Sequence, residues 1–310
     1  MRLIAAFLKM IRLPNLLFIA LTQILFQVCI YESLYPDSVS GNAPLRFAFL
    51  ILASVLIAAA GYIINDYFDI NIDEVNKPER MVVDKIISRR WAILWHFVLS
   101  LAGIFFTILA MPLLSKWHLV AANVLCVALL WFYSTNFKKS LLTGNIVISL
   151  LTAWTILIVF FSKVDITDAF GNSEINQVKF FRLALLYAGF AFIISLIREA
   201  IKDMEDMHGD SRYGCKTMPL VWGLNGTKVY VAVWLVVLIC LVLIIQVYIL
   251  QFRWWIPVLY CIFTIILPLS LVLLRLRKSV TQKEFRQLST IMKLVMLTGI
   301  LSMVFFYFIL

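Results

Sequence analysis

Apolar residues dominate this chain in long runs that short polar segments interrupt. Nine runs have about 20 residues, the length that a helix needs to cross the hydrocarbon core of a bilayer. They lie near residues 14–32, 45–64, 91–111, 117–135, 143–162, 181–200, 227–250, 254–274 and 289–310. No low-complexity tract or long linker separates them. The pattern therefore predicts an all-α polytopic membrane protein, with one domain over residues 1–310 and nine transmembrane helices in one bundle.

The composition agrees with this class. Hydrophobic residues make up 63% of the 310 positions and charged residues 14%, with a mean hydropathy of +0.97, which the surface of a soluble domain would not tolerate. The formal charge of +10 does not require a nucleic acid, because the basic residues border the apolar runs, where they fix topology and attract anionic groups. The five cysteines and three histidines lack ligand spacing, which argues against zinc.

Lysine and arginine predict the orientation of the bundle. If the N-terminus is cytoplasmic, 21 of the 27 basic residues fall on the inner side and six on the outer side. This imbalance follows the positive-inside rule. It places the C-terminus outside and the polar segments 65–90 and 198–226 in the cytoplasm. Each segment has enough residues either to continue the preceding helix or to form a short helix plus a turn, and both are expected to cap the bundle as loops.

Two acidic clusters with identical spacing stand out in the inner segments, and each member of the second follows its counterpart in the first by 137 positions. They are Asp66, Asp69, Asp73 and Asp203, Asp206, Asp210. On a helix, offsets of 0, 3 and 7 place three side chains within roughly a 60° arc. Each cluster is therefore expected to present one face of carboxylate oxygens.

A charge run beside a membrane span is usually a solvated loop, but the matched spacing favours a shared chemical role. Magnesium takes one or two carboxylates and completes its shell with water and phosphate oxygens. The six aspartates are therefore predicted Mg²⁺ ligands, and a substrate that carries a diphosphate is implied. Basic side chains beside the clusters, Arg80, Lys202 and Arg212, are candidates to bind that diphosphate, with surface ion pairing as the alternative.

Two further groups of polar residues lie at the same side. The segment after the fourth run supplies Tyr133, Lys138 and Lys139, which could also be an interfacial aromatic and topology charges. Asn15 lies at the start of the first run and is expected to point into the bundle, since a polar side chain that faces lipid is costly. Its alternative role is to begin a helix after Pro14.

These motifs together resemble the UbiA-type intramembrane prenyltransferases over most of the chain. Asn65, Asp66, Asp69 and Asp73 match the N-D-x-x-D-x-x-x-D motif after the second helix of that family. The second acidic cluster matches the family's motif after the sixth helix, and Tyr133 with Lys138 matches its Tyr–Lys motif. The resemblance adds Asn65 to the metal ligands and implies catalytic roles for Asp69, Asp206, Tyr133 and Lys138.

The resemblance also implies a reaction, in which a prenyl diphosphate loses its diphosphate with the help of Mg²⁺ and a lipophilic acceptor at the membrane takes the prenyl group. The motifs look most similar to the branch that adds geranylgeranyl to geranylgeranylglyceryl phosphate. An aromatic quinone precursor is the alternative acceptor. One segment departs from the family: residues 80–85 read RMVVDK where many members read RPLPSG.

Two other functions are weighed against this one. An ion-coupled transporter would carry its ionisable residues midway through the spans, whereas these acids lie at the inner ends. A phosphatidyl or phosphosugar transferase would also pair aspartates with magnesium, but it would release a nucleotide rather than diphosphate. The sequence leaves the acceptor, the prenyl length and any protein partner open.

Overall fold

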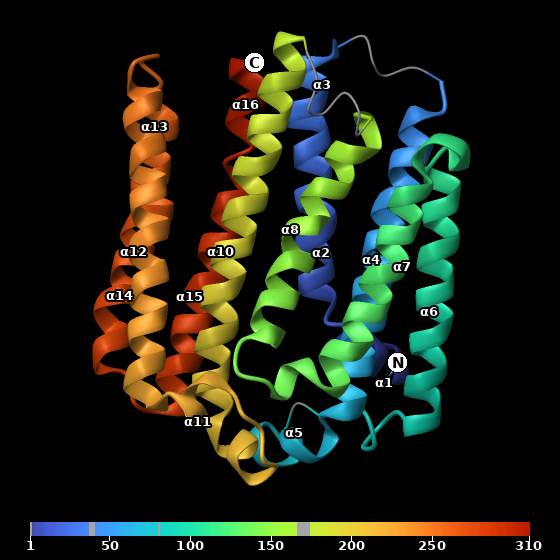
Figure 1. The fold of residues 1–310 in the computed structure, drawn as a ribbon, viewed down its shortest axis with the longest axis vertical. Helices are drawn as coiled ribbons and strands as arrows, with labels where there is room; N and C mark the ends of the chain where they lie inside the picture. The colour runs from blue at the N-terminus through green and yellow to red at the C-terminus, as the bar shows by residue number, and fades with distance from the viewer. Residues whose placement is uncertain (1, 37–40, 80, 166–173) are drawn as a thin grey trace. The chain divides into compact units, whose positions relative to one another are not determined.

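The computed structural model describes residues 2–36, 41–79, 81–165 and 174–310, and helices form almost all of these ranges (Figure 1). Nine helices within the described ranges are long and apolar enough to cross a membrane. The prediction of an all-α polytopic membrane protein with nine spans is confirmed.

The spans correspond closely to the apolar runs. They are α2 (Leu13–Leu25) with its continuation through η1 (Phe26–Tyr31) and α3 (Glu32–Leu34), α4 (Ala43–Phe68), α6 (Arg89–Ala110), α7 (Leu113–Thr135), α8 (Thr143–Lys163), α10 (Ile175–Arg212), α12 (Gly223–Leu250), α13 (Trp255–Cys261) with η4 (Ile262–Ile266) and α14 (Leu267–Lys278), and α15 (Gln282–Leu301) with α16 (Val304–Ile309). Four short helices complete the described elements: α1 (Arg2–Met10), α5 (Ile70–Asn76), η3 (Phe137–Lys139) and α11 (Met218–Val221).

Helix α10 differs most from its predicted range of 181–200. It has 38 residues, which at 1.5 Å per residue gives about 57 Å, against about 30 Å for the bilayer core. The apolar run ends near residue 200, but the helical backbone continues through polar residues to Arg212. The second acidic cluster therefore lies within a helix, as a continuation of the sixth membrane-crossing helix rather than in the loop that follows it.

The chain divides into two compact units. Unit 1 comprises Met1–Lys138 and Trp154–Ala188, and unit 2 comprises Lys139–Ala153 and Gly189–Leu310. The division falls inside α8 and α10, so each of these helices contributes to both units.

In unit 1, α4 packs closely against α6 and α7, and two glycines allow this approach. A Cβ atom on Gly103 of α6 would lie 2.6 Å from Cγ1 of Ile57 and 3.2 Å from the carbonyl oxygen of Ala53. A Cβ on Gly61 of α4 would lie 2.8 Å from a methyl group of Leu130 of α7. Small residues permit such backbone approach between membrane helices. These contacts fix the helix whose C-terminal end carries the first acidic cluster.

Unit 2 has its own apolar core, to which α10, α12, α14 and α15 contribute fully buried residues such as Ile197, Leu235, Leu269 and Met292. Helix α15 begins with a capping box, in which the Thr281 side chain accepts a hydrogen bond from the Glu284 backbone and the Glu284 carboxylate accepts one from Thr281 N. This arrangement satisfies two backbone donors at the helix start. The prediction of one domain over residues 1–310 stays a prediction.

Candidate active site

The first acidic cluster lies where α4 passes into α5. The backbone bends at Asp69 (φ −90°, ψ 0°), yet Asp69 N donates to Asn65 O (3.0 Å) and Asp73 N donates to Asp69 O (2.8 Å). The i to i−4 hydrogen bonds thus continue across the bend. The three aspartates follow a bent helical path rather than the straight helix face expected from their spacing.

Asp66 pairs with Arg12, which connects α1 to α2. The guanidinium Nη2 lies 2.6 Å from Oδ1 of Asp66, and Arg12 Cζ lies 5.1 Å from the ring centre of Tyr62. Arg12 has a left-handed backbone conformation (φ 52°, ψ 53°), which is uncommon for a residue with a Cβ atom. The ion pair joins the start of α2 to the end of α4.

Asp69 is the most deeply buried acid of the first cluster, with 3% of its surface exposed. Its Oδ2 accepts a hydrogen bond from Asn65 Nδ2 (2.6 Å) and forms a short ion pair with Lys138 Nζ. Burial alone would lower the pKa of Lys138, but the charge of Asp69 and the influence of Tyr133 raise that pKa well above its usual value. The structure thus brings Asn65, Asp69 and Lys138 together, with Tyr133 acting on the same ammonium group.

Asp73 completes the first cluster on α5 and is half-buried. Burial, and then the negative charge of Asp69, raise the pKa of Asp73 to about 6, against the lowering effect of Lys138. Its carboxyl group therefore gains or loses a proton not far below neutral pH when no metal is bound.

The second acidic cluster lies on one unbroken helix, the C-terminal part of α10. Asn145, in the first turn of α8 and only 7% exposed, donates through Nδ2 to Oδ2 of Asp203 (2.8 Å). Asp206 is half-buried and Asp210 is buried. Here the expected helix face is present, since α10 has no break between its members.

Two buried glutamates engage the cations around the second cluster. Glu199 Oε1 lies 2.9 Å from Arg198 Nη1, and its Oε2 lies 2.9 Å from Lys202 Nζ. Glu205 Oε1 lies 3.1 Å from Arg286 Nε of α15. Lys202, a predicted diphosphate ligand, thus contacts Glu199, and the sequence reasoning overlooked both glutamates.

The other predicted substrate-binding residues have different surroundings. Lys139 and Arg212 are exposed, and Asn15 is half-buried in the first turn of α2, with its backbone N donating to Arg12 O (2.8 Å). Arg80 lies outside the described residues.

The segment that departs from the family pattern packs into the protein. Val82 and Val83 are buried in the core formed with Met10, Ile63 and Ala92. Asp84 follows with a left-handed backbone (φ 71°) and pairs with Arg89 (2.9 Å) at the start of α6. The two valines thus hold the α5–α6 connection against α1, α4 and α6 through apolar contacts.

The residues of the clusters suit a hard divalent cation. Among the described residues, no group of three or more His, Cys, Asp or Glu side chains is arranged to hold a metal by itself. Asn65 Oδ1 is buried and accepts no hydrogen bond from a described residue, although its amide nitrogen donates to Asp69. A buried oxygen acceptor beside a carboxylate fits Mg²⁺, which completes its shell with water and phosphate oxygens.

Comparison with known proteins identifies the family. The profile of the UbiA prenyltransferase family matches residues 18–297, and this chain belongs to that family. The digeranylgeranylglyceryl phosphate synthase of Methanothermobacter thermautotrophicus is 34% identical over 60% of this chain and 61% of that protein. The synthase of the same name from Methanospirillum hungatei is 32% identical over 74% of this chain and 72% of that protein. The alignment with the first of these relatives thus spans less than two thirds of its length.

Solved structures show the same fold. A UbiA homologue from Aeropyrum pernix K1, solved in its apo form, is 17% identical with a TM-score of 0.62 over 92% of this chain and 98% of that one. A UbiA homologue from Archaeoglobus fulgidus bound to DMAPP and Mg²⁺ is 14% identical with a TM-score of 0.56 over 96% of this chain and 98% of that one. The predictions of the family, of a prenyltransferase and of an integral membrane protein are confirmed.

Proposed function

We propose that this protein transfers a prenyl group from a prenyl diphosphate to a lipophilic acceptor, with Mg²⁺ as cofactor. The observation that carries the proposal is the contact of the buried Asn65 and Asp69 with the half-buried Lys138, in which oxygen atoms that could hold a cation lie beside a charged ammonium. A basic residue that only fixes membrane topology would not require a buried carboxylate and a buried amide oxygen beside it. The DMAPP and Mg²⁺ bound to the Archaeoglobus fulgidus homologue support it.

Each residue has a proposed role. Asn65, Asp66, Asp69, Asp73, Asp203, Asp206 and Asp210 supply oxygen ligands for Mg²⁺. When bound, the metal supplies Lewis acid assistance to the departing diphosphate. Lys138 is proposed to donate hydrogen bonds to a diphosphate oxygen, and Tyr133 to act beside it. The C1–O bond of the donor breaks with its electron pair going to diphosphate, while an acceptor oxygen forms the new bond to C1 and releases its proton.

The proposed acceptor is a prenylglyceryl phosphate. The names of the two archaeal relatives support this choice, and so do the exposed cations Lys139 and Arg212, which can bind a second phosphate. Lys202 and Arg80 are further candidates for the phosphate groups, and Asn15 for the substrate. An aromatic quinone precursor would not use a second phosphate site.

The decisive experiment is mass spectrometry of the lipids that the purified full-length protein forms in nanodiscs. Prenyl diphosphates of different length are offered with a prenylglyceryl phosphate or with 4-hydroxybenzoate, with and without a chelator. The expected result is a prenylated glyceryl phosphate with release of diphosphate, and none with chelator. Prenylation of the aromatic ring alone would overturn the acceptor. Product formation that is unaffected by chelator would overturn the metal role.

We also propose that the N-terminus and both acidic clusters face the cytoplasm. The 21-to-6 division of basic residues supports this orientation. In a variant that lacks the five native cysteines, single cysteines at Asp84 and at Arg253 should react with an impermeant thiol reagent from opposite sides of the membrane, Asp84 from the cytoplasm. Labelling of both from one side would contradict the nine-span topology, and reversed sidedness would contradict the orientation.

The whole of residues 1–310 is proposed to act as one catalytic domain. A single family profile covers residues 18–297, and α8 and α10 each run through both compact units without interruption. Limited proteolysis of the native protein should therefore yield no separately active fragment.

A further inference from the structure

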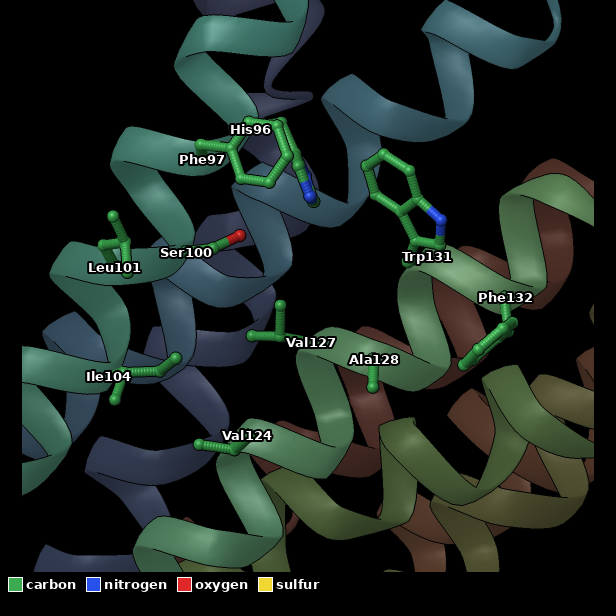
Figure 2. Close-up of a pocket in the computed structure, with 10 residues that line it drawn as sticks. All are labelled: His96, Phe97, Ser100, Leu101, Ile104, Val124, Val127, Ala128, Trp131 and Phe132. Atoms are coloured by element: carbon green, nitrogen blue, oxygen red, sulfur yellow. The ribbon is translucent and has the colours of Figure 1, made fainter.

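A pocket of about 360 Å³ lies between α6 and α7 of unit 1, and it contains none of the acidic or basic residues assigned above. Helix α6 contributes His96 and Ser100 to its wall, and α7 contributes Val127 and Trp131 (Figure 2). Almost all of its surface is apolar. Its volume is within the range of sites that bind small molecules.

The pocket lies at membrane depth and its rim is accessible from outside the protein. Ser100 is the twelfth of the 22 residues of α6, close to the middle of a membrane-crossing helix. Phe97 and Leu101, which neighbour it on α6, are 50% and 67% exposed. Molecules dissolved in the bilayer can therefore enter the pocket without passing through the protein.

The Ser100 hydroxyl is a polar group in the wall of this otherwise apolar pocket. The residue is 4% exposed, and Oγ forms no hydrogen bond with any residue in the described part of the chain. Figure 2 shows this oxygen pointing away from α6 toward the space that Val127 and Trp131 border. A buried hydroxyl without a partner is unfavourable, and hydrocarbon tails cannot supply the missing bond.

His96 adds a second polar atom one turn earlier on α6. Its Nδ1 lies 2.9 Å from the carbonyl oxygen of Ala60, which can only accept a hydrogen bond. A neutral ring must therefore carry its proton on Nδ1, and Nε2 is left as an acceptor. The ring also lies beside Trp131, with 5.3 Å between the ring centres and 46° between the ring planes. The pocket thus offers a hydroxyl and an imidazole beside flat aromatic walls.

The shape of the rim favours a lipid over a transmembrane helix. Helix contacts in membranes use small residues that let two backbones approach. Here the large side chains of Phe97, Leu101 and Phe132 are exposed around a hollow, so a narrow molecule can reach Ser100 where a helix would be held away.

We propose that the α6–α7 pocket binds a neutral lipid that carries one hydrogen-bonding oxygen, either a hydroxyl or a carbonyl, and that Ser100 bonds this oxygen. The site is independent of the proposed prenyl transfer. It requires no charge on the ligand, in contrast to the acidic clusters.

The test is photocrosslinking of the full-length protein in nanodiscs with hexadecan-1-ol that carries a diazirine in its chain. Peptide mass spectrometry should place crosslinks on α6 and α7 around Ser100 and Val127. Unlabelled hexadecan-1-ol, and the matched ketone, should compete about tenfold better than hexadecane, as expected for one buried hydrogen bond. Equal competition by the alkane, or labelling spread over all spans, would overturn the proposal.

Substitutions separate the contribution of the Ser100 hydroxyl from that of the shape of the pocket. Ser100→Ala should retain crosslinking but lose the preference for the alcohol over the alkane. Ala128→Phe should fill the pocket and abolish labelling, and Val124→Phe is the substitute if that variant does not fold. Ser162→Ala is the control, since its hydroxyl already donates to Val159 O (2.7 Å). An unchanged preference in Ser100→Ala would overturn the role of the serine. Crosslinks between two copies of the chain at this face would identify the occupant as a second copy and overturn the lipid.

Discussion

The two acidic clusters have the same spacing in the sequence but different electrostatic surroundings. In the first, Asp66 and Asp69 each contact a cation, Arg12 and Lys138. In the second, Asp203 accepts its hydrogen bond from the neutral amide of Asn145, while Arg198 and Lys202 contact Glu199. Two motifs with the same spacing thus differ in the charge of the groups that contact their aspartates.

This difference has a chemical consequence. If a metal bound beside Asp69, it would compete with the Lys138 ammonium for the same carboxylate oxygen, and the ammonium would then be available to a phosphate oxygen. A metal beside Asp203 would meet the neutral amide of Asn145 at that carboxylate instead of an ammonium group. We therefore expect metal binding and diphosphate binding to be coupled at the first cluster. At the second cluster, we expect the affinity for the metal to depend on how Asn145 orients the Asp203 carboxylate.

The largest effect is expected from removing one acid of each cluster. Asp69→Asn and Asp206→Asn should each lower turnover by about 100-fold or more, because each removes the negative charge of a proposed Mg²⁺ ligand, and the metal would stabilise the charge that develops on the diphosphate. Diphosphate release in nanodiscs measures this loss. Asp165→Asn is the control, as this exposed acid pairs with Lys116 (2.7 Å) and belongs to neither cluster. Turnover within threefold of wild type in either cluster variant would contradict the shared role.

Removing the cation of the first cluster should affect stability as well as activity. Lys138→Met leaves the buried Asp69 carboxylate without its ammonium, which is expected to cost about 2–3 kcal/mol of stability. Excess Mg²⁺ should restore part of this loss by taking the place of the cation. Thermal unfolding in detergent, with and without Mg²⁺, measures both effects. A melting temperature that does not change, or that Mg²⁺ does not raise, would mean that Lys138 does not neutralise Asp69.

Removing the amide of the second cluster should have a smaller and more selective effect. Asn145→Ala leaves the Asp203 carboxyl group in place but removes the amide that donates a hydrogen bond to it. The Mg²⁺ concentration for half-maximal rate should rise about tenfold, as is usual for residues that orient a metal ligand. Rates measured over a magnesium titration test this, with Ser162→Ala on the same helix as the control. A fall in maximal rate with no change in magnesium dependence would favour a different role for Asn145.

The last expected effect concerns how the stability of the metal-free protein depends on pH. Burial raises the pKa of Asp73 from 3.8 to about 6. Between these values the folded state holds a proton that the unfolded state releases, so Asp73 increasingly disfavours the folded state as pH rises from about 4 to about 6. Asp73→Asn removes this penalty and should stabilise the protein by up to about 3 kcal/mol above pH 6 but not at pH 4. Denaturant titrations with chelator measure the free energy of unfolding of both proteins at pH 4 and above pH 6. An equal change in stability at the two pH values would contradict the raised pKa of Asp73.

Local patterns in the sequence were sufficient to predict the fold and the clusters. A hydrophobic run long enough to cross a bilayer is visible residue by residue, and so is the repeated spacing of the aspartates. The length of α10 was not visible, because polar residues after Ile201 end the apolar run without ending the helix.

The contacts within the site were harder to predict. Arg12 and Asp66 are 54 positions apart, and Asn145 and Asp203 are 58 apart. Which helices bring such residues together is a matter of packing rather than of spacing. The bend at Asp69 was also missed, since the residues around it are compatible with a straight helix.

The close contact at Gly103 has a consequence for sequence variation. Any side chain at this position must displace Ile57 or the α4 backbone, whereas around a Cβ on Gly189 nothing lies within 4 Å. Among randomly mutated copies selected for a folded product, alanine should be rare at position 103 and common at position 189. Deep sequencing of such a library measures this, and equal tolerance at both would contradict the tight packing. The glycine thus limits how far lineages of this protein can diverge along the α4–α6 contact while leaving α10 freer to change.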